Sequence, residues 1–205
     1  MNSSDDDKQR TERHNKRMQR HKKVVDAKMA KATQEQGIIL ILTGNGKGKS
    51  SSAFGMLARS LGHGHKCAVV QFIKGQQDCG ENLFFNQHDR VDFLLMKTGF
   101  TWETQNFEAD KEAAITIWQQ AKEFLKTTDY DLVIFDEITY MFKYKYLDEA
   151  EFIETLVQRP SSQSVIITGR GASKNLIEVA DTVTECQLTK HAFNEGIKAR
   201  KGIEF

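Results

Sequence analysis

The sequence has few of the features that define secreted, membrane-spanning or polyanion-binding proteins. Its 205 residues include one proline and three cysteines, and the formal net charge is +1. Cys67, Cys79 and Cys186 lie far apart and without paired metal-ligand spacing, which argues against a disulfide framework or a zinc site. No apolar run reaches membrane-spanning length. Near-neutral charge also disfavours a general nucleic-acid surface. We therefore expect a cytoplasmic protein that has no nucleic-acid or membrane partner.

Residues 38–50 contain the strongest motif, an apolar run of strand length followed by a glycine-rich turn and Gly-Lys-Ser. Gly44, Gly46 and Gly48 allow backbone angles that bring successive N–H groups towards an anion. Residues 50–61 have apolar side chains at helical spacing, and the dipole of such a helix favours phosphate at its N-terminus. A plain glycine-rich turn is the alternative, but strand, turn, lysine, hydroxyl and helix together predict a phosphate-binding loop.

The loop supplies the candidate nucleotide ligands. Lys49 adds a positive charge, and the hydroxyl of Ser50 is placed to bind Mg²⁺. In the usual pattern four residues separate a first glycine from Gly-Lys-Ser, but here Thr43 takes the place of that glycine and Gly44 comes one residue late. The predicted nucleotide-binding residues of the loop are Gly44, Asn45, Gly46, Lys47, Gly48, Lys49, Ser50 and Ser51.

Five more segments of strand length follow, each rich in apolar residues. They lie at residues 66–73, 91–96, 132–137, 164–168 and about 182–187. Between them, helical spacing of apolar residues is clearest at about 107–126 and 147–158. Strands that alternate with helices are joined by right-handed crossovers. We predict an α/β fold of the phosphate-loop class, with a mostly parallel six-stranded sheet and helices on both faces.

Candidate charged residues follow two of these strands. Residues 132–135 are apolar and lead into Asp136 and Glu137, the Walker B arrangement that places a carboxylate beside Mg²⁺. We predict Ser50, Asp136 and Glu137 as metal-side residues, and the sequence leaves open which acid contacts the metal directly. Arg170 follows the strand at 164–168 and so emerges at the edge where ligands bind. It is either a phosphate contact or an exposed turn residue.

Two large aromatic residues, Phe100 and Trp102, lie in a predicted loop between a strand and the helix at 107–126. Aromatic residues in such a loop are unusual. They either anchor the loop to the core or serve the ligand site, and composition alone does not decide between these roles.

The first 36 residues differ in composition from the rest of the chain. They carry ten Lys or Arg, six Asp or Glu and no aromatic residue. Nothing breaks a helix between about residue 8 and about residue 32. In such a helix, Met18, Val25, Met29 and Ala32 would form a narrow apolar stripe. The segment is either a solvated basic tail or a helix that orders on docking. We predict a basic, conditionally helical arm at 1–36 and an α/β domain at 37–205.

Taken together, the motifs resemble those of ATP:corrinoid adenosyltransferases of the bacterial cobalamin-biosynthesis type, from residue 8 to the end. The most specific motif is Phe-Thr-Trp-Glu-Thr at 100–104. Members of this family also lack the early glycine of the phosphate loop. The other shared motifs lie at 44–50, 53–55, 71–75, 136–141, 159–160, 166–171, 180–183 and 190–193.

The resemblance implies a reaction in which a reduced Co(I) corrinoid attacks C5′ of ATP. Tripolyphosphate leaves, and a cobalt–carbon bond forms on cobalamin, cobinamide or cobyrinic acid a,c-diamide. It also implies Mg²⁺ as a cofactor, a homodimer, and an electron-donating reductase such as a flavoprotein. Because Co(I) has no proton to lose, such a reaction needs no general base.

The resemblance also implies roles for particular residues. Lys49 would stabilise the leaving tripolyphosphate. Phe100 and Trp102 would cover the lower axial face of the corrinoid, so that four-coordinate Co(II) becomes easier to reduce. The arm at 1–36 would close over ATP and corrinoid.

Three other functions fit the phosphate loop. A motor or switch ATPase would hydrolyse the γ-phosphate, but the folded part lacks a basic surface interleaved with aromatic residues. A small-molecule kinase would release ADP. A corrinoid carrier would bind cobalamin without consuming ATP.

Overall fold

The computed structural model describes residues 3–73, 79–96 and 106–204. The chain divides into two compact units, Met1–Glu35 and Gln36–Phe205. The first unit contains α1 (Ser3–Met29), whose residues from position 7 onward are exposed. Its apolar side chains are exposed as well, with Met18 at 45% and Met29 at 68%. The arm is therefore helical here, and its closure over a ligand stays a prediction.

The second unit is built on a six-stranded sheet in which every strand pairing is parallel. The strand order is β3-β2-β4-β5-β1-β6. This confirms the predicted α/β fold class. The strands are β1 (Ile39–Thr43), β2 (Cys67–Gln71), β3 (Val91–Leu95), β4 (Leu132–Asp136), β5 (Ser164–Thr168) and β6 (Thr182–Glu185).

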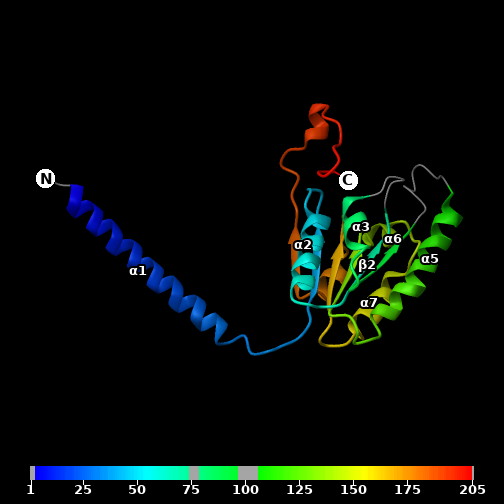
Figure 1. Cartoon of the computed structure of the whole chain (residues 1–205), viewed down its shortest axis with the longest axis horizontal. Helices are drawn as coiled ribbons and strands as arrows, with labels where there is room; N and C mark the ends of the chain where they lie inside the picture. The colour runs from blue at the N-terminus through cyan, green and yellow to red at the C-terminus, as the bar shows by residue number, and fades with distance from the viewer. Residues whose placement is uncertain (1–2, 74–78, 97–105, 205) are drawn as a thin grey trace. The chain divides into compact units, whose positions relative to one another are not determined.

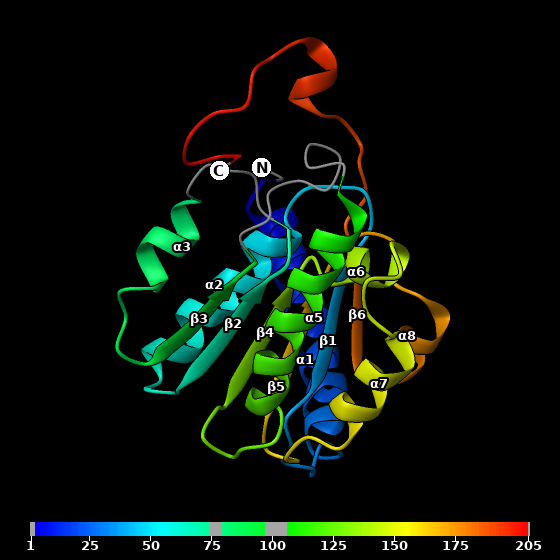
Figure 2. The same ribbon diagram turned by 90° about the vertical axis from the view of Figure 1, so that its right-hand side faces the viewer.

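Helices cover both faces of the sheet, as Figures 1 and 2 show. One face packs on α2 (Lys49–Gly62) and α3 (Gly80–Phe85). The other packs on α5 (Phe107–Phe124), α6 (Thr139–Lys143), α7 (Glu149–Val157) and α8 (Lys174–Glu178). A short 3-10 helix, η1 (Ala192–Glu195), lies in the C-terminal tail.

The central strands are apolar throughout because both of their faces are buried. In β1, Ile41 belongs to the core beneath α5 and α7, whereas Leu42 belongs to the core beneath α2. In β2, Val69 and Val70 divide in the same way. This explains why the sequence shows continuous apolar runs rather than alternation.

The sequence did not predict α6, which occupies the tyrosine-rich block after β4. The rings of Tyr140 and Tyr144 stack with their centroids 5.8 Å apart, which is the i,i+4 neighbour relation of a helix. Met141 is fully buried in the core below them. The helical spacing was present in the sequence, but the segment is only five residues long.

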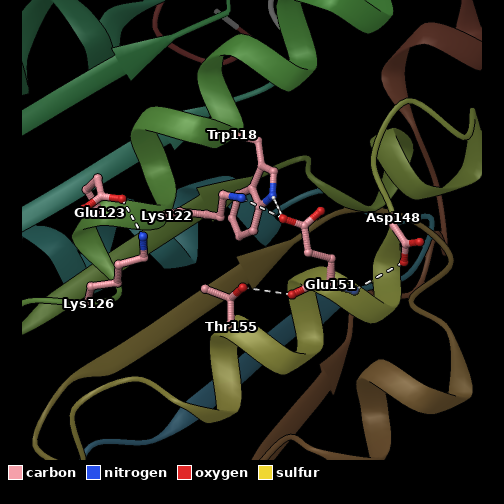
Figure 3. Close-up of polar contacts among 7 residues, drawn as sticks. All are labelled: Trp118, Lys122, Glu123, Lys126, Asp148, Glu151 and Thr155. Carbon is pink, nitrogen blue, oxygen red and sulfur yellow. Dashed lines mark hydrogen bonds and ion pairs between the residues drawn. The ribbon is translucent and has the colours of Figure 1, made fainter.

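Helices α5 and α7 are tied together by a polar contact over the core (Figure 3). Lys122 Nζ lies 2.7 Å from Glu151 Oε1, and the indole nitrogen of Trp118 donates to the same oxygen at 3.4 Å. The ammonium lowers the pKa of the Glu151 carboxyl. Asp148 caps α7 by accepting from the backbone nitrogens of residues 150 and 151. Trp118 is 2% exposed and belongs to the hydrophobic core on this face of the sheet.

Gln163 stabilises the connection between α5 and β4 through hydrogen bonds to its backbone. Its Nε2 donates to the carbonyl oxygens of Phe124, Thr127 and Tyr130, at 2.9, 3.3 and 3.1 Å. The side chain is fully buried.

We expect Gln163→Leu to lower the free energy of unfolding by about 2–4 kcal/mol, because buried carbonyls lose their donor. Urea unfolding measures this change. Gln158→Leu, which removes an exposed amide from α7, should change it by less than about 0.5 kcal/mol. Equal losses would contradict the prediction.

No helix in the described part of the chain is both long and apolar enough to cross a bilayer.

Candidate functional site

The phosphate loop follows β1 and lies against the chain that leaves β6. Gly46 N donates to Cys186 O at 2.7 Å, and Cys186 N donates to Thr43 O at 2.8 Å. A Cβ on Gly44 would lie 2.4 Å from Cys186 O, and one on Gly46 would lie 2.4 Å from Gln187 O. This crowding, together with a φ of 95° at Gly44, explains why glycine stands at these positions.

Thr43, at the place of the usual first glycine, also has a structural role. Its hydroxyl accepts a hydrogen bond from Ala172 N at 3.2 Å, in the connection between β5 and α8. The side chain therefore ties the start of the loop to the end of a neighbouring strand. The contacts of Thr43 with Ala172 and of Gly44 with Cys186 thus explain why threonine comes first and glycine one residue later.

Lys49 is the first residue of α2, and its side chain turns back to the loop that precedes the helix. Its side chain is 5% exposed, and Nζ donates to Gly46 O at 2.8 Å. Burial lowers the pKa of this ammonium; the nearby carboxylates of Glu137 and Asp136 oppose the shift, and the guanidinium of Arg170 adds to it. The structure therefore brings Lys49, both predicted acids and Arg170 into one electrostatic neighbourhood.

The N-terminus of α2 completes an anion-binding loop. Gly48, with φ 109°, is the N-cap residue and has no side chain to cap the helix. The backbone nitrogens of Lys49, Ser50 and Ser51 belong to the first turn, where intrahelical partners do not exist. They are available to an anion, and the helix dipole adds to the attraction. Asn45, Lys47 and Ser51 are exposed, and Ser50 is half-buried.

The C-terminal tail contacts the loop, a feature that the sequence did not specify. Lys47 Nζ and Glu204 Oε2 form an ion pair. The hydrogen bond from Lys47 lowers the pKa of the Glu204 carboxyl, with a smaller contribution from His191. In the sequence, only the charged residues of the tail hint at this contact, and such residues also fit a solvated segment.

Asp136 ends β4 and is held on both sides. It is 1% exposed; Thr168 Oγ1 donates to its Oδ1 at 2.7 Å, and Gln71 Nε2 donates to its Oδ2 at 2.9 Å. Glu137 follows with a φ of 60°, and its backbone nitrogen donates to Thr168 Oγ1 at 2.9 Å. Left-handed backbone at a residue with a Cβ concentrates at functional sites. Sequence reasoning found the two acids and missed Thr168 and Gln71.

Arg170 emerges at the same edge of the sheet after β5 and is exposed. Its carbonyl accepts from Thr139 Oγ1 at 3.0 Å. Gly169, with φ 146°, lies so close to this threonine that a Cβ would be 2.0 Å from Oγ1. Arg170 also opposes the burial-driven rise in the pKa of Tyr140. Arg170 therefore lies just beyond the carboxyl end of β5, and its contact with phosphate stays a prediction.

Phe100 and Trp102, the predicted corrinoid-facing residues, lie outside the described residues. Among the residues that the structure does describe, no group of three His, Cys, Asp or Glu side chains is arranged to hold a metal ion.

A phosphate-binding loop with a buried lysine, facing strand-end acids on a parallel sheet, defines a nucleotide-binding protein of the phosphate-loop class. The family model "ATP:corrinoid adenosyltransferase BtuR/CobO/CobP" matches residues 35–205, and the chain belongs to this family.

Several relatives agree with this assignment. The chain is 50% identical over 194 residues to the corrinoid adenosyltransferase of Escherichia coli K12, covering 95% of this chain and 98% of that protein. Corrinoid adenosyltransferase CobA of Salmonella typhimurium gives the same identity and coverage. The Pseudomonas aeruginosa enzyme is 50% identical over 198 residues, 96% of this chain and 98% of its own. Among solved structures, the RadB recombinase aligns over 76% of this chain and 77% of its own, with 14% identity and a TM-score of 0.46.

Proposed function

We propose that the residues at the carboxyl ends of β1, β4 and β5 bind ATP and stabilise its triphosphate while the adenosyl group passes to a reduced corrinoid. Adenosyl transfer from ATP to corrinoids is the reaction of the family to which the chain belongs. The observation that supports this site is the buried Lys49 ammonium within the loop, beside Asp136, Glu137 and Arg170.

The proposed chemistry is a displacement at C5′ of the ATP ribose. Co(I) of the corrinoid supplies the electron pair, the cobalt–carbon bond forms, and the C5′–O bond breaks with its electrons leaving on tripolyphosphate. Cobalt has no proton to lose, so the protein needs no general base. Its contribution is to position the two substrates and to stabilise the negative charge of the leaving group.

Three groups of this chain suit that task. The backbone N–H groups of the loop and of the first turn of α2 bind phosphate oxygens without reorganising. The Lys49 ammonium lies in a nearly dry position, where a charge interacts more strongly than it does in water. Arg170 approaches the same place from β5 and binds a second part of the triphosphate.

The donor set at this edge fits Mg²⁺. A serine hydroxyl and two carboxylates are the hard oxygen ligands that this ion prefers, and Mg²⁺ usually takes one or two carboxylates together with substrate phosphates. We propose that Ser50 and Glu137 approach the ion from the protein side, and that Asp136 supports the ion from its buried position. When bound, Mg²⁺ would supply positive charge to the triphosphate.

Other parts of the proposal rest on the family resemblance. Phe100 and Trp102 cover the lower axial face of the corrinoid, so that Co(II) loses its axial ligand and is more easily reduced. The arm closes over the bound substrates. The protein works as a cytoplasmic homodimer and receives electrons from a reductase such as a flavoprotein.

An anaerobic assay with chemically reduced Co(I) cobalamin, Mg²⁺ and ATP tests the proposal. We expect adenosylcobalamin, followed by its absorbance, together with equimolar tripolyphosphate. Steady release of ADP or phosphate without a corrinoid product would instead show hydrolysis or phosphoryl transfer. Cobalamin binding without ATP consumption would identify a carrier.

The same assay tests the aromatic pair. We expect Phe100→Ala and Trp102→Ala to lose most turnover when Co(II) cobalamin and a reductant are supplied, and to keep it when Co(I) is supplied, because only the reduction step needs four-coordinate cobalt. Trp118→Phe, a change in the core of α5, is the control and should affect both substrates alike. Equal losses with Co(I) and Co(II) would assign the pair to binding or folding instead.

A further inference from the structure

We propose that Thr168 and Gln71 are positioning residues that set how the acid pair Asp136–Glu137 meets Mg²⁺ and ATP. The inference deepens the proposed function, because it rests on Mg²⁺ binding at these acids. Neither residue belongs to the motifs of the phosphate loop or of the strand-end acids. The argument comes from the hydrogen bonds that join three neighbouring strands.

The three strand ends are consecutive in the sheet. The strand order places β4 between β2 and β5, and Gln71 is the register partner of Asp136. Phe135 of β4 pairs with Ile167 of β5. The next residue of β5, Thr168, therefore lies beside Asp136 on the side opposite to Gln71. Side chains at paired positions of a parallel sheet point to the same face. Asp136 therefore stands between a hydroxyl and an amide that are both fixed by the sheet.

Thr168 acts on both acids through one oxygen atom. Its Oγ1 donates to Asp136 Oδ1 at 2.7 Å and accepts from Glu137 N at 2.9 Å. Thr168 is fully buried, and its backbone lies in β5, so this oxygen has little freedom to move. The second contact holds Glu137 at a φ of 60°, a conformation that a residue with a Cβ keeps only when its surroundings enforce it. The hydroxyl thus fixes the direction in which the Glu137 side chain leaves the strand.

Gln71 holds the other carboxylate oxygen, and its own orientation is fixed by Cys79. The thiol of Cys79 donates to Gln71 Oε1 at 3.6 Å, which leaves Nε2 to donate to Asp136 Oδ2 at 2.9 Å. Gln71 is fully buried and Cys79 is 4% exposed. The sulfur of Cys79 also accepts from Asn82 N and so caps α3. The amide is held between a helix cap and the carboxylate.

These contacts matter for a metal site because a donor on each oxygen fixes the lone-pair directions of the carboxylate. Asp136 accepts one hydrogen bond on each oxygen, and each oxygen keeps a second acceptor direction. Residues that orient metal ligands are worth about 10- to 100-fold in metal affinity or activity. A purely structural tie between strands would instead affect folding without changing the response to metal.

The test is the Mg²⁺ dependence of ATP binding by the full chain, measured by isothermal titration calorimetry. For Thr168→Val, which keeps the shape and removes the hydroxyl, we expect the Mg²⁺ concentration that half-saturates the effect on ATP binding to rise about tenfold or more. ATP affinity in the presence of EDTA should change by less than about twofold. Thr168→Ser, which restores the hydroxyl, should restore wild-type Mg²⁺ dependence.

Gln71→Met provides an independent second variant, and we expect a shift in the same direction. If Thr168→Val does not fold, as judged by its melting curve, the test relies on two separate variants of the other residue, Gln71→Met and Gln71→Glu. Thr155→Val, which removes a hydroxyl that bonds to Glu151 O on α7, is the matched control and should leave Mg²⁺ dependence unchanged.

The outcomes separate this inference from the proposed function. If folded Thr168→Val and Gln71→Met keep wild-type Mg²⁺ dependence, or weaken ATP binding equally with Mg²⁺ and with EDTA, the positioning role is overturned. If ATP binding by the wild-type chain does not respond to Mg²⁺ at all, the proposed metal site fails and this inference fails with it. Adenosyl transfer is measured separately, so its success or failure does not enter this comparison.

Discussion

Replacing Lys49 by Met should remove most of the adenosyl transfer while leaving the fold intact. The Lys49 ammonium is buried in the phosphate loop and donates to Gly46 O. In the reaction we propose, negative charge grows on the oxygen that leaves C5′ with tripolyphosphate. A fixed charge in a site that excludes water stabilises such a leaving group more than solvent does.

The expected loss is about 10²- to 10³-fold in kcat, the usual effect of removing one preorganised donor from a reacting anion. It should appear with Co(I) cobalamin as substrate, because Lys49 acts on ATP rather than on cobalt reduction. Lys47→Met is the matched control: Lys47 is a lysine of the same loop, but it is exposed and paired with Glu204. Its loss should reduce kcat by less than about tenfold. Equal effects of the two substitutions would show that the loop acts through its overall charge.

Stability provides a second readout for Lys49, with a definite sign. Burial lowers the pKa of the ammonium, so the unfolded chain binds this proton more tightly than the folded chain does. At pH values below the lowered pKa, the folded protein therefore bears a cost for the buried charge. The cost begins to fall as the pH rises above that pKa, and it is gone above the ordinary lysine value of 10.5. At acidic to neutral pH we expect Lys49→Met to melt at the same temperature as wild type or higher. Lost activity together with a large drop in melting temperature would point to a damaged fold instead.

Much of the fold was predictable because each strand is an apolar run bounded by turn residues. The segment at 164–168 coincides with β5, and the segment at 132–137 contains β4. Such runs are recognisable because both faces of a parallel sheet are buried. The helix α6 was missed for a local reason: in a five-residue helix, aromatic side chains alone do not show the period clearly.

The candidate site was predictable only where local sequence determines it. Lys49 and Asp136 follow strands within recognisable motifs, and their common location follows from the parallel arrangement. Thr168 and Gln71 lie within the shared motifs at 166–171 and 71–75, but those motifs do not reveal their role, which depends on lateral neighbours from strands far apart in sequence. The ion pair between Lys47 and Glu204 joins residues 157 positions apart, and no spacing rule relates them.

The loop glycines allow the second large effect to be predicted, because the structure separates two reasons for having no side chain. Gly44 has a positive φ of 95° and is also crowded, since a Cβ would lie 2.4 Å from Cys186 O. Gly46 is crowded by Gln187 O at 2.4 Å but does not have a positive φ. Gly48 has a φ of 109° and no atom within 4 Å of the added Cβ.

We expect Gly44→Ala to lower the free energy of unfolding by about 3 kcal/mol or more, because backbone strain of about 1–3 kcal/mol adds to the displacement of a strand-bound backbone. Gly48→Ala should cost about 1–3 kcal/mol from strain alone, and Gly46→Ala should show the effect of crowding alone. Urea unfolding of the three variants and the wild type measures these differences.

The same variants connect the loop to the segment that follows β6. The backbone of Cys186 holds the loop through its contacts with Gly46 and Thr43. An alanine at position 44 or 46 must push the loop away from the backbone of residues 186 and 187, whereas an alanine at position 48 need not. ATP affinity should therefore fall more for Gly44→Ala than for Gly48→Ala, even when each is measured well below its melting temperature. If Gly48→Ala proves as damaging to both stability and ATP binding as Gly44→Ala, positive φ rather than the contact with residues 186 and 187 determines the shape of the loop.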